Sequence, residues 1–314
     1  MKAFYLISYG GSDAAKYGDL PDPVVGNDKL LIQVKAVSIN PVDFKIKRGD
    51  LKMIVGSKFP KIVGSDFAGI IKEAGQEIKN FKAGDRVYGA VPIFFRKSGT
   101  LSELINLDPR YARPIPEGMT FDEAASLPVA ALTALNGLRK CNITTGKYVL
   151  INGATGGVGH FAIQIAKAKG AVVTATCNPD NVELAKKLGA DEITGYSRDD
   201  FAKTGNKFDA ILDAYGKMEY ADVCRLLKRK GIYASTLFMP TSIFSSVFVQ
   251  LVFQKKLTSS NMRSRPEDYG EIEKLFNEKM LSPLIENTFT LEKAAEAFEL
   301  AEKWKPRGKI IIRI

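Results

Sequence analysis

A glycine-rich loop near the middle of the 314-residue chain carries the clearest chemical signal. It reads NGATGGVG over residues 152–159, follows an apolar strand pattern at residues 148–152 and opens a helical pattern. With Ala154 in place of the first glycine, Gly156 and Gly159 complete the pattern G-x-G-x-x-G. There the second glycine lets backbone approach a pyrophosphate, and the third allows close packing of helix on strand. The loop therefore predicts a dinucleotide site rather than a tight turn without a ligand.

The helix that follows the loop supports a phosphate site. Its apolar residues fall on one face, and Gly170 is placed to end it. The N-terminus of such a helix offers N–H groups and a partial positive charge to phosphate oxygens. The single histidine, His160, falls just inside this helix, where a packing or surface role is expected.

The end of the next strand, residues 172–176, bears on the choice of cofactor. Sites that prefer NAD usually carry an acidic residue there, which holds the ribose 2′-hydroxyl. No acid ends this strand, so the space can take a 2′-phosphate, which favours NADPH with NADH as the alternative. Asp180 lies close by and opposes this interpretation. The residues expected to contact the cofactor here are Thr176, Asn178, Asn181 and Tyr196.

Strand and helix patterns indicate what positions the loop. Residues 1–120 show short strands broken by Gly, Pro and Asp, which predicts a β-rich region. Residues 121–262 alternate strands with helices, which predicts βαβ units and a parallel sheet. The expected strands are residues 148–152, 172–176, 208–212 and 231–237, and the expected helices are residues 122–140, the loop to Lys169, 182–188 and 219–227.

Residues 263–314 break this alternation, with helices expected at 266–279 and 291–303 and a strand at 309–314. A chain in which one domain is inserted into another explains why both ends differ from the middle. We therefore expect an α/β protein, with a doubly wound domain of residues 121–262 inserted into a β-rich domain of residues 1–120 and 263–314.

Composition excludes several classes of protein. The chain is 45% hydrophobic and 25% charged, as soluble globular proteins are. The longest apolar stretch, residues 243–253, is too short to span a bilayer and is expected to be a buried helix. The apolar N-terminal segment is too short for a secretory signal. The net charge of +10 is spread along the chain, which favours a solvated basic surface over a nucleic-acid site.

Three cysteines, Cys141, Cys177 and Cys224, match neither a disulfide framework nor a paired zinc knuckle. They are expected to be reduced thiols, which indicates a cytosolic protein.

Several stretches besides the loop resemble one family. The chain is similar to the zinc-free, zeta-crystallin-like quinone oxidoreductase branch of the medium-chain dehydrogenase/reductase superfamily, and to plant enone and alkenal reductases of that branch. Together the stretches are far more specific than the glycines alone, and they span nearly the whole chain. They are SINPVDFK at residues 38–45, FKAGDRV at 81–87, LPVAALTAL at 127–135, LGAD at 188–191 and RGKI at 307–310.

The resemblance implies a GroES-like catalytic domain formed by both ends of the chain and a Rossmann domain, with the cofactor in the cleft against it. It also implies a homodimer joined through the cofactor domains. Asn40 and Lys45 match active-site and cofactor-contacting positions, Thr133 a nicotinamide-side position, and Lys309 a cleft position. The loop residues expected to contact the cofactor are Ala154, Gly156, Gly157, Val158 and Gly159.

Two departures from relatives concern the metal and the cofactor. Zinc-dependent relatives have a Cys near the position of Ser38, a His-Glu pair around residues 64–66 and a four-cysteine lobe. One histidine and three scattered cysteines cannot assemble those two sites, so we expect no metal. Relatives in the zinc-free branch often carry Lys or Arg close to Asp180 and Asn181, whereas this chain does not, which leaves the preference for NADPH open.

Without a metal as Lewis acid, substrates that accept hydride easily are favoured over simple alcohols and ketones. We expect hydride transfer from NADPH to a quinone or to the β-carbon of an α,β-unsaturated carbonyl, with a proton from water. Asn40 is expected to hydrogen-bond a substrate oxygen, and Asp43 to fix the local turn. Two alternatives are an alcohol or aldehyde reductase of the same superfamily and a non-enzymatic NADPH-binding sensor or nucleic-acid-binding protein.

Overall fold

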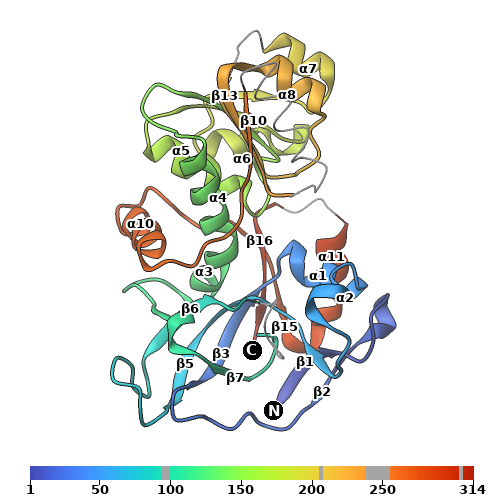
Figure 1. Ribbon diagram of the computed structural model, residues 1–314, viewed down its shortest axis with the longest axis vertical. Coiled ribbons are helices and arrows are strands. Elements are labelled where there is room, and N and C mark those ends of the chain that lie inside the picture. The colour runs from blue at the N-terminus through green and yellow to red at the C-terminus, as the bar shows by residue number, and fades with distance from the viewer. Residues whose placement is uncertain (93–98, 205–207, 238–254, 304–306) are drawn as a thin grey trace. The chain divides into compact units, whose positions relative to one another are not determined.

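The computed structural model describes residues 1–92, 99–204, 208–237, 255–303 and 307–314 (Figure 1). The chain folds as two compact units: unit 1 is Met1–Val129 with Ile285–Ile314, and unit 2 is Ala130–Leu284. The apolar stretch at residues 243–253, expected to be a buried helix, lies outside the described residues. Within the described ranges, no helix combines the length and the apolar character needed to cross a membrane.

Unit 1 is built on two β-sheets. In the described part of the chain, the larger sheet has the order β15-β16-β3-β5-β6-β8, with β7 also paired to β3, and the smaller has the order β2-β1-β4. The strands are β1 Lys2–Leu6, β2 Ala15–Asp19, β3 Leu30–Ser38, β4 Lys61–Ile62, β5 Asp66–Ala74, β6 Arg86–Ala90, β7 Leu104–Leu107, β8 Arg113–Pro114, β15 Ile285–Thr290 and β16 Lys309–Arg313.

The two ends of the chain meet in the larger sheet. Strand β16 pairs antiparallel with β3, with Ile312 opposite Val37. Beyond the last pair, the Ile39 N–H donates to the carbonyl of Ile310 at 3.0 Å. Because Ile310, Ile311 and Ile312 are each no more than 3% exposed, this strand is fixed by burial as well as by pairing. The pairing brings Lys309 next to the residues that follow β3.

The helices of unit 1 cover and connect these sheets. Two expected helices begin or divide differently from the sequence prediction. The pattern at residues 122–140 forms two helices, because Pro128 has no N–H to continue the first. The pattern at 291–303 begins as a 3₁₀ turn. The elements are η1 Ser12–Ala14, α1 Pro41–Arg48, α2 Lys52–Val55, η3 Pro109–Tyr111, α3 Phe121–Ser126, η5 Leu291–Lys293 and α11 Ala294–Glu302, and α4 Pro128–Lys140 continues into unit 2.

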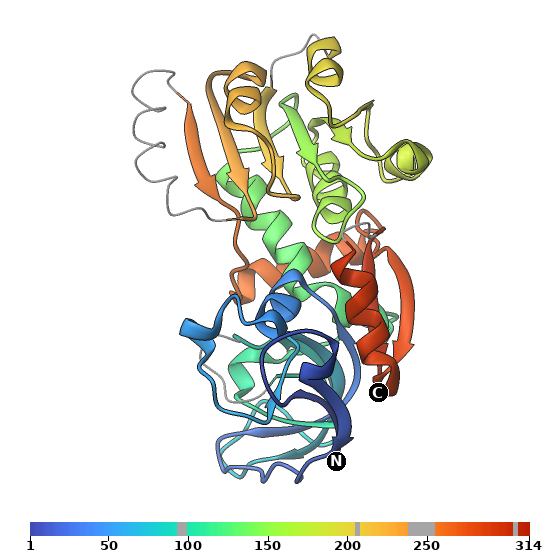
Figure 2. The ribbon, with the colours of Figure 1, turned by 90° about the vertical axis from the view of Figure 1, so that its right-hand side faces the viewer.

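Unit 2 contains the predicted parallel sheet. Its strand order is β11-β10-β9-β12-β13-β14, with parallel pairing throughout, which is the doubly wound order of a Rossmann fold. Figure 2 shows these strands next to one another in the upper part of the view. They are β9 Tyr148–Asn152, β10 Val172–Thr176, β11 Glu192–Thr194, β12 Phe208–Asp213, β13 Leu227–Ser235 and β14 Lys256–Ser259.

The helices of unit 2 pack by their apolar faces. On α5, Phe161, Ala162 and Ile165 are fully buried, as the one-sided pattern predicts. Gly170 has a φ of +75°, a conformation that suits glycine after a helix end. The remaining elements are α5 Gly159–Ala168, η4 Pro179–Asn181, α6 Val182–Lys187, α7 Arg198–Lys203, α8 Tyr220–Leu226 and α10 Pro266–Asn277.

The boundaries of the two units lie later in the chain than the sequence places them. The first falls after Val129 instead of residue 120, because the Val129 N–H donates to the buried Asp66 carboxylate of unit 1 at 3.0 Å. The second falls after Leu284 instead of residue 262. Arg139 of α4 pairs with Asp268 and Glu271, which attaches α10 to unit 2. Side-chain contacts of this kind leave no periodic pattern in the sequence.

Candidate functional site

The glycine loop lies at the carboxyl end of β9, between that strand and α5. Its base is held by side chains from the ends of three neighbouring strands. Asn152 at the end of β9 donates from Nδ2 to Asp213 Oδ1 at the end of β12, at 2.7 Å. Thr176 at the end of β10 donates from Oγ1 to Asn152 Oδ1, also at 2.7 Å. All three side chains are almost fully buried, so they fix the loop from beneath.

Two of the predicted cofactor residues belong to this support. Thr176 accepts the Gly153 N–H at its Oγ1 at 3.0 Å, and its carbonyl accepts the Ala154 N–H at 3.0 Å. Thr176 and Ala154 are both fully buried. Their positions indicate that they shape the loop.

The upper surface of the loop is open. Gly156, Gly157 and Val158 are partly exposed, and a Cβ built on Gly156 would meet only the Gly153 carbonyl oxygen, at 3.4 Å. Gly159 is different, because its Cβ would lie 2.1 Å from that same oxygen. Gly156 therefore leaves space above the loop, and Gly159 allows close packing beneath it. An open backbone at the start of α5 is chemically suited to a pyrophosphate.

The other predicted nucleotide residues lie around the end of β10. Asn178 is exposed, whereas Asn181 is 7% exposed and donates from Nδ2 to Thr155 Oγ1 of the glycine loop at 3.1 Å. The Asn181 Oδ1 is buried and has no hydrogen-bond partner among the described residues. Tyr196 donates its hydroxyl to the Thr176 carbonyl at 3.5 Å, and burial raises the pKa of Tyr196 to about 12.

Thr133 lies on α4 and is 7% exposed. Its carbonyl accepts a hydrogen bond from Ser260 Oγ at 2.7 Å, which ties α4 to the segment after β14. His160 is fully buried on α5, with Nδ1 3.0 Å from the Gly156 carbonyl, in agreement with its expected packing role.

Unit 1 contains a buried polar cluster that includes two predicted residues. Lys309 Nζ donates to Asn40 Oδ1 at 2.6 Å and lies 3.8 Å from Asp66 Oδ2. Asn40 donates from Nδ2 to the same Asp66 oxygen at 2.8 Å, and Ser38 Oγ donates to it at 2.6 Å. All four residues are at most 3% exposed. The Asn40 amide is therefore engaged on both sides, by a carboxylate and by an ammonium group.

Burial sets the charge balance of this cluster. It raises the pKa of the Asp66 carboxyl, and the nearby Lys309 ammonium opposes that rise. It also lowers the pKa of Lys309, against the attraction of Asp66 and Asp43. The carboxylate and the ammonium group thus each depend on the other to stay charged away from water.

Asp43 fixes the start of α1, as the sequence predicts. Its carboxylate accepts the Asn40 N–H at 2.8 Å and Ser65 Oγ at 2.9 Å. Burial raises the pKa of this fully buried carboxyl from 3.8 to about 7; among the other contributions, Asp66 adds to the rise and Lys309 opposes it. Near neutral pH this group therefore exchanges a proton.

We expect Asp43 to make stability depend on pH in a specific direction. The folded chain holds the Asp43 proton to a higher pH than the unfolded chain, so stability from this group is lost as pH rises from about 4 to about 7. Asp43→Asn removes that loss. Denaturant unfolding of both proteins between about pH 5 and 7 measures the effect. The free energy of unfolding of the variant, relative to that of the parent, should increase as pH rises. A difference that stays constant over this range would contradict the assignment.

Lys45 is the more accessible lysine of the predicted set. It lies on α1 and is half-buried, and burial followed by the neighbouring Arg48 lowers its pKa. Unlike Lys309, it is not enclosed by the buried cluster.

The resemblance implies that zinc-dependent relatives place zinc ligands near Ser38 and around residues 64–66, where this chain has Gly64, Ser65 and Asp66. The side chains of Ser38, Ser65 and Asp66 bond within the buried cluster and to Asp43. Among the described residues, no three His, Cys, Asp or Glu side chains gather as a metal site would require.

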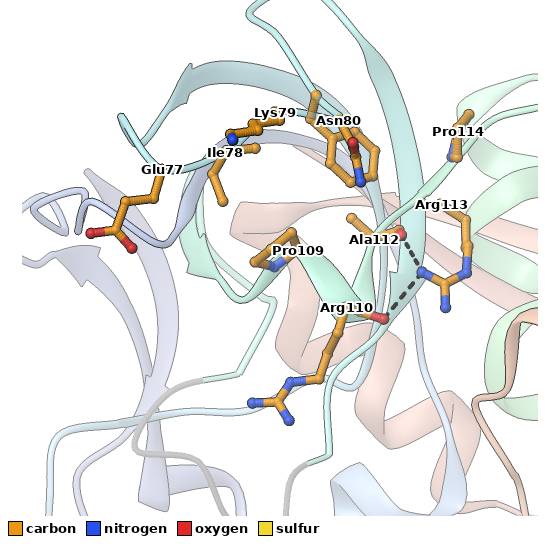
Figure 3. Close-up of a pocket in the computed structure, with 10 residues that line it drawn as sticks. Glu77, Ile78, Lys79, Asn80, Pro109, Arg110, Ala112, Arg113 and Pro114 are labelled. Carbon is orange, nitrogen blue, oxygen red and sulfur yellow. Dashed lines mark hydrogen bonds between the residues drawn. The ribbon is translucent and has the colours of Figure 1, made fainter.

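A separate hollow on unit 1, about 700 Å³ in volume, is lined by other residues (Figure 3). Arg110 pairs with Asp108 there, and Arg113 Nη1 donates to the carbonyls of Arg110 and Ala112. None of the predicted site residues lines it.

The sequence assigned no role to Asn152, Asp213 or Asp66 as site residues. Asn152 and Asp213 each end an apolar strand of the parallel sheet, and Asp66 begins an apolar strand. Ligands bind such sheets outside the carboxyl ends of the strands, so polar residues at the ends of β9 and β12 were the available signal. Asp66 has no comparable signal, because its partners are far apart in the sequence: Ser38 and Asn40, Val129 of α4 and Lys309 of β16.

Two protein-family models of dehydrogenase domains match this chain. Residues 26–117 match the alcohol dehydrogenase GroES-like domain, and residues 188–312 match a family described as zinc-binding dehydrogenase.

Individual relatives match over nearly the full length. A mitochondrial NAD(P)H oxidoreductase of Bos taurus is 33% identical, over 100% of this chain and 89% of that protein. A 2-methylene-furan-3-one reductase of Solanum lycopersicum is 32% identical, over 99% of this chain and 79% of that protein. The solved quinone oxidoreductase of Coxiella burnetii is 31% identical with a TM-score of 0.89, over 100% of this chain and 99% of that chain.

Proposed function

Because this chain belongs to the medium-chain dehydrogenase/reductase superfamily, with quinone oxidoreductases among its relatives, we propose that it reduces quinones or α,β-unsaturated carbonyls with NADPH and without zinc. It is an NAD(P)H-dependent oxidoreductase. The observation that carries the proposal is the open glycine loop at the start of α5. The absence of zinc is proposed from the resemblance, because this chain has Ser38, Ser65 and Asp66 in the regions where zinc-dependent relatives are expected to place their ligands.

The residues of unit 2 fit the cofactor. The backbone at Gly156, Gly157 and Val158 would hold the pyrophosphate, with the N-terminus of α5 adding positive charge. Asn152 and Thr176 would keep that backbone in place through their buried hydrogen bonds. When bound, the nicotinamide supplies a hydride to the substrate.

In unit 1 we assign different tasks to the predicted residues. The half-buried Lys45 would contact cofactor or substrate as a charged donor. Asn40 and Lys309 are joined at 2.6 Å and buried with Asp66, so their task would be to hold the neighbouring backbone in one geometry. A fixed arrangement raises the rate by keeping the reacting groups aligned. Water would supply the proton that completes the reduction of an unsaturated carbonyl.

A direct assay tests this function. Metal-free protein is mixed with NADPH or NADH and a panel of quinones, enals, enones and simple ketones, and loss of the reduced nicotinamide is followed by absorbance. We expect turnover of quinones or unsaturated carbonyls that a chelator does not change. Turnover of simple ketones alone would instead indicate an alcohol or aldehyde reductase, and cofactor binding without any turnover would favour a non-enzymatic role.

The assembly and location belong to the proposal as well. We propose a homodimer in the cytosol, on the basis of the family resemblance and of three cysteines that are free thiols. Sedimentation of the purified protein measures its mass and tests the dimer.

A further inference from the structure

We propose that Lys217 is the cation that recognises the 2′-phosphate of NADPH. This inference rests on the proposed function and deepens it, because it names the residue that would separate NADPH from NADH. In sequence the lysine is far from the end of β10, where the 2′ group of the cofactor is expected, and the fold connects the two through a pair of tyrosines.

The segment that follows β10, where the 2′ group of the cofactor is expected, contains no positively charged residue. The segment after β10 reads Cys177 to Asn181, and Asp180 is its only ionisable residue besides the cysteine. On the following helix, Lys186 pairs with Glu183 at 2.9 Å. A 2′-phosphate carries about −1.5 to −2 charge, so a site that prefers it needs a cation from elsewhere.

The loop after β12 supplies one. Lys217 Nζ lies over the ring of Tyr215, 5.0 Å from its centroid. The Tyr215 ring is 6.4 Å from the ring of Tyr196, centroid to centroid. The Tyr196 hydroxyl in turn reaches the carbonyl of Thr176, the last residue of β10, at 3.5 Å. A continuous row of side chains therefore connects the lysine to the end of the strand where the 2′ group is expected.

The backbone that carries Lys217 is held in place. Asp213 accepts the Gly216 N–H at 2.7 Å and the Met218 N–H at 3.0 Å, so a hydrogen bond lies on each side of the lysine. Gly216 has a φ of +76°, which a residue with a side chain rarely adopts. The Asp213 carboxylate also accepts the Tyr233 hydroxyl at 2.8 Å and is fully buried.

This support matters for binding. When a lysine lies on a mobile loop, ordering that loop on binding costs entropy and reduces the net binding free energy. A lysine on a loop that is already fixed avoids most of this cost. The side chain is exposed, so its ammonium group is accessible to a ligand that approaches from solvent. A hydrogen bond from an ammonium group to a phosphate is charge-assisted, which makes it stronger than the contact of an exposed lysine with a ring face.

Binding measurements test the inference separately from catalysis. We would measure the dissociation constants of NADPH and NADH by calorimetry, for the parent and for Lys217→Gln. Loss of a charge-assisted hydrogen bond should weaken NADPH binding about tenfold, with NADH binding changed less than about twofold. Lys217→Arg should keep most of the preference, and added salt should reduce NADPH affinity more in the parent than in Lys217→Gln.

Lys228 offers a matched control. Its Nζ also lies 5.0 Å from a tyrosine ring centroid, that of Tyr148, but both residues are at the amino ends of their strands. Lys228→Gln should therefore leave the ratio of the two dissociation constants unchanged.

Two results would overturn the assignment in different ways. If the parent binds both cofactors and Lys217→Gln leaves the ratio of their affinities unchanged, Lys217 does not read the 2′-phosphate, and the proposed function still stands. If the parent binds neither cofactor, both the proposed function and this inference are wrong.

Discussion

Replacing Lys309 with methionine lowers the free energy of unfolding by about 3–5 kcal/mol, the usual cost of removing one partner of a buried ion pair. Lys309 is 3% exposed, and its ammonium group is 3.8 Å from Asp66 Oδ2 and 2.6 Å from Asn40 Oδ1. Methionine fills similar space but leaves the Asp66 carboxylate buried without its cation. Equilibrium unfolding in denaturant measures the change.

A double variant separates charge from packing. If the cost comes from the stranded carboxylate, Lys309→Met combined with Asp66→Asn should cost less than the sum of the two single variants. Arg313→Gln is the control. Arg313 lies on the same strand as Lys309 and pairs with Asp122 of α3, but it is 64% exposed, so its loss should change stability little. Additive single variants would show that the two residues do not act as a pair.

Replacing Gly159 with alanine disrupts both unit 2 and cofactor binding. The added Cβ would lie 2.1 Å from the Gly153 carbonyl oxygen and 2.7 Å from Ala154 backbone atoms, so the loop must move. Forcing an extra carbon into such a contact costs about 1–3 kcal/mol or more. We expect a lower melting temperature and NADPH binding weakened by at least about tenfold, which corresponds to about 1.4 kcal/mol.

Gly156→Ala is the matched comparison within the same loop. Its Cβ meets one atom at 3.4 Å, an ordinary contact, so the melting temperature should stay close to that of the parent. Its effect should fall on NADPH affinity, because the new methyl group takes space above the loop. If Gly159→Ala instead melts like the parent and binds NADPH normally, the loop has freedom that this geometry does not allow.

Local patterns predicted much of the fold correctly. The strand at residues 172–176 has the bounds expected, because an apolar run between turn signals leaves little choice of element. Helix and strand alternation predicted the parallel sheet of unit 2, and the family stretches predicted that the chain ends return to the β-rich unit. The helix at residues 122–140 was wrong as a single element, because its apolar spacing continues across Pro128 although the backbone hydrogen bonds do not.

In the candidate site too, some residues could be predicted from the sequence and others could not. Gly156 and Gly159 could be singled out because their loop is continuous in sequence and glycine has few other reasons to recur at that spacing. The predicted contact roles of Lys45 and of Asn178, Asn181 and Tyr196 remain predictions. For Asn40, burial with Lys309 and Asp66 favours a positioning role over the predicted contact with substrate. Asp66 and Asp213 could not be singled out, because an isolated aspartate looks the same in sequence whether it is buried with partners or faces water.

The sequence by itself determined the family, the two kinds of unit and the glycine loop, since each depends on residues that are neighbours or follow a short period. Only the tertiary structure decided which distant side chains share one environment. Strand pairing put Lys309 beside Asn40 and Asp66, and the folding of the β12 loop around Asp213 put Lys217 above Tyr215. Charge and burial act through space, so their effects depend on distances that the order of residues does not contain.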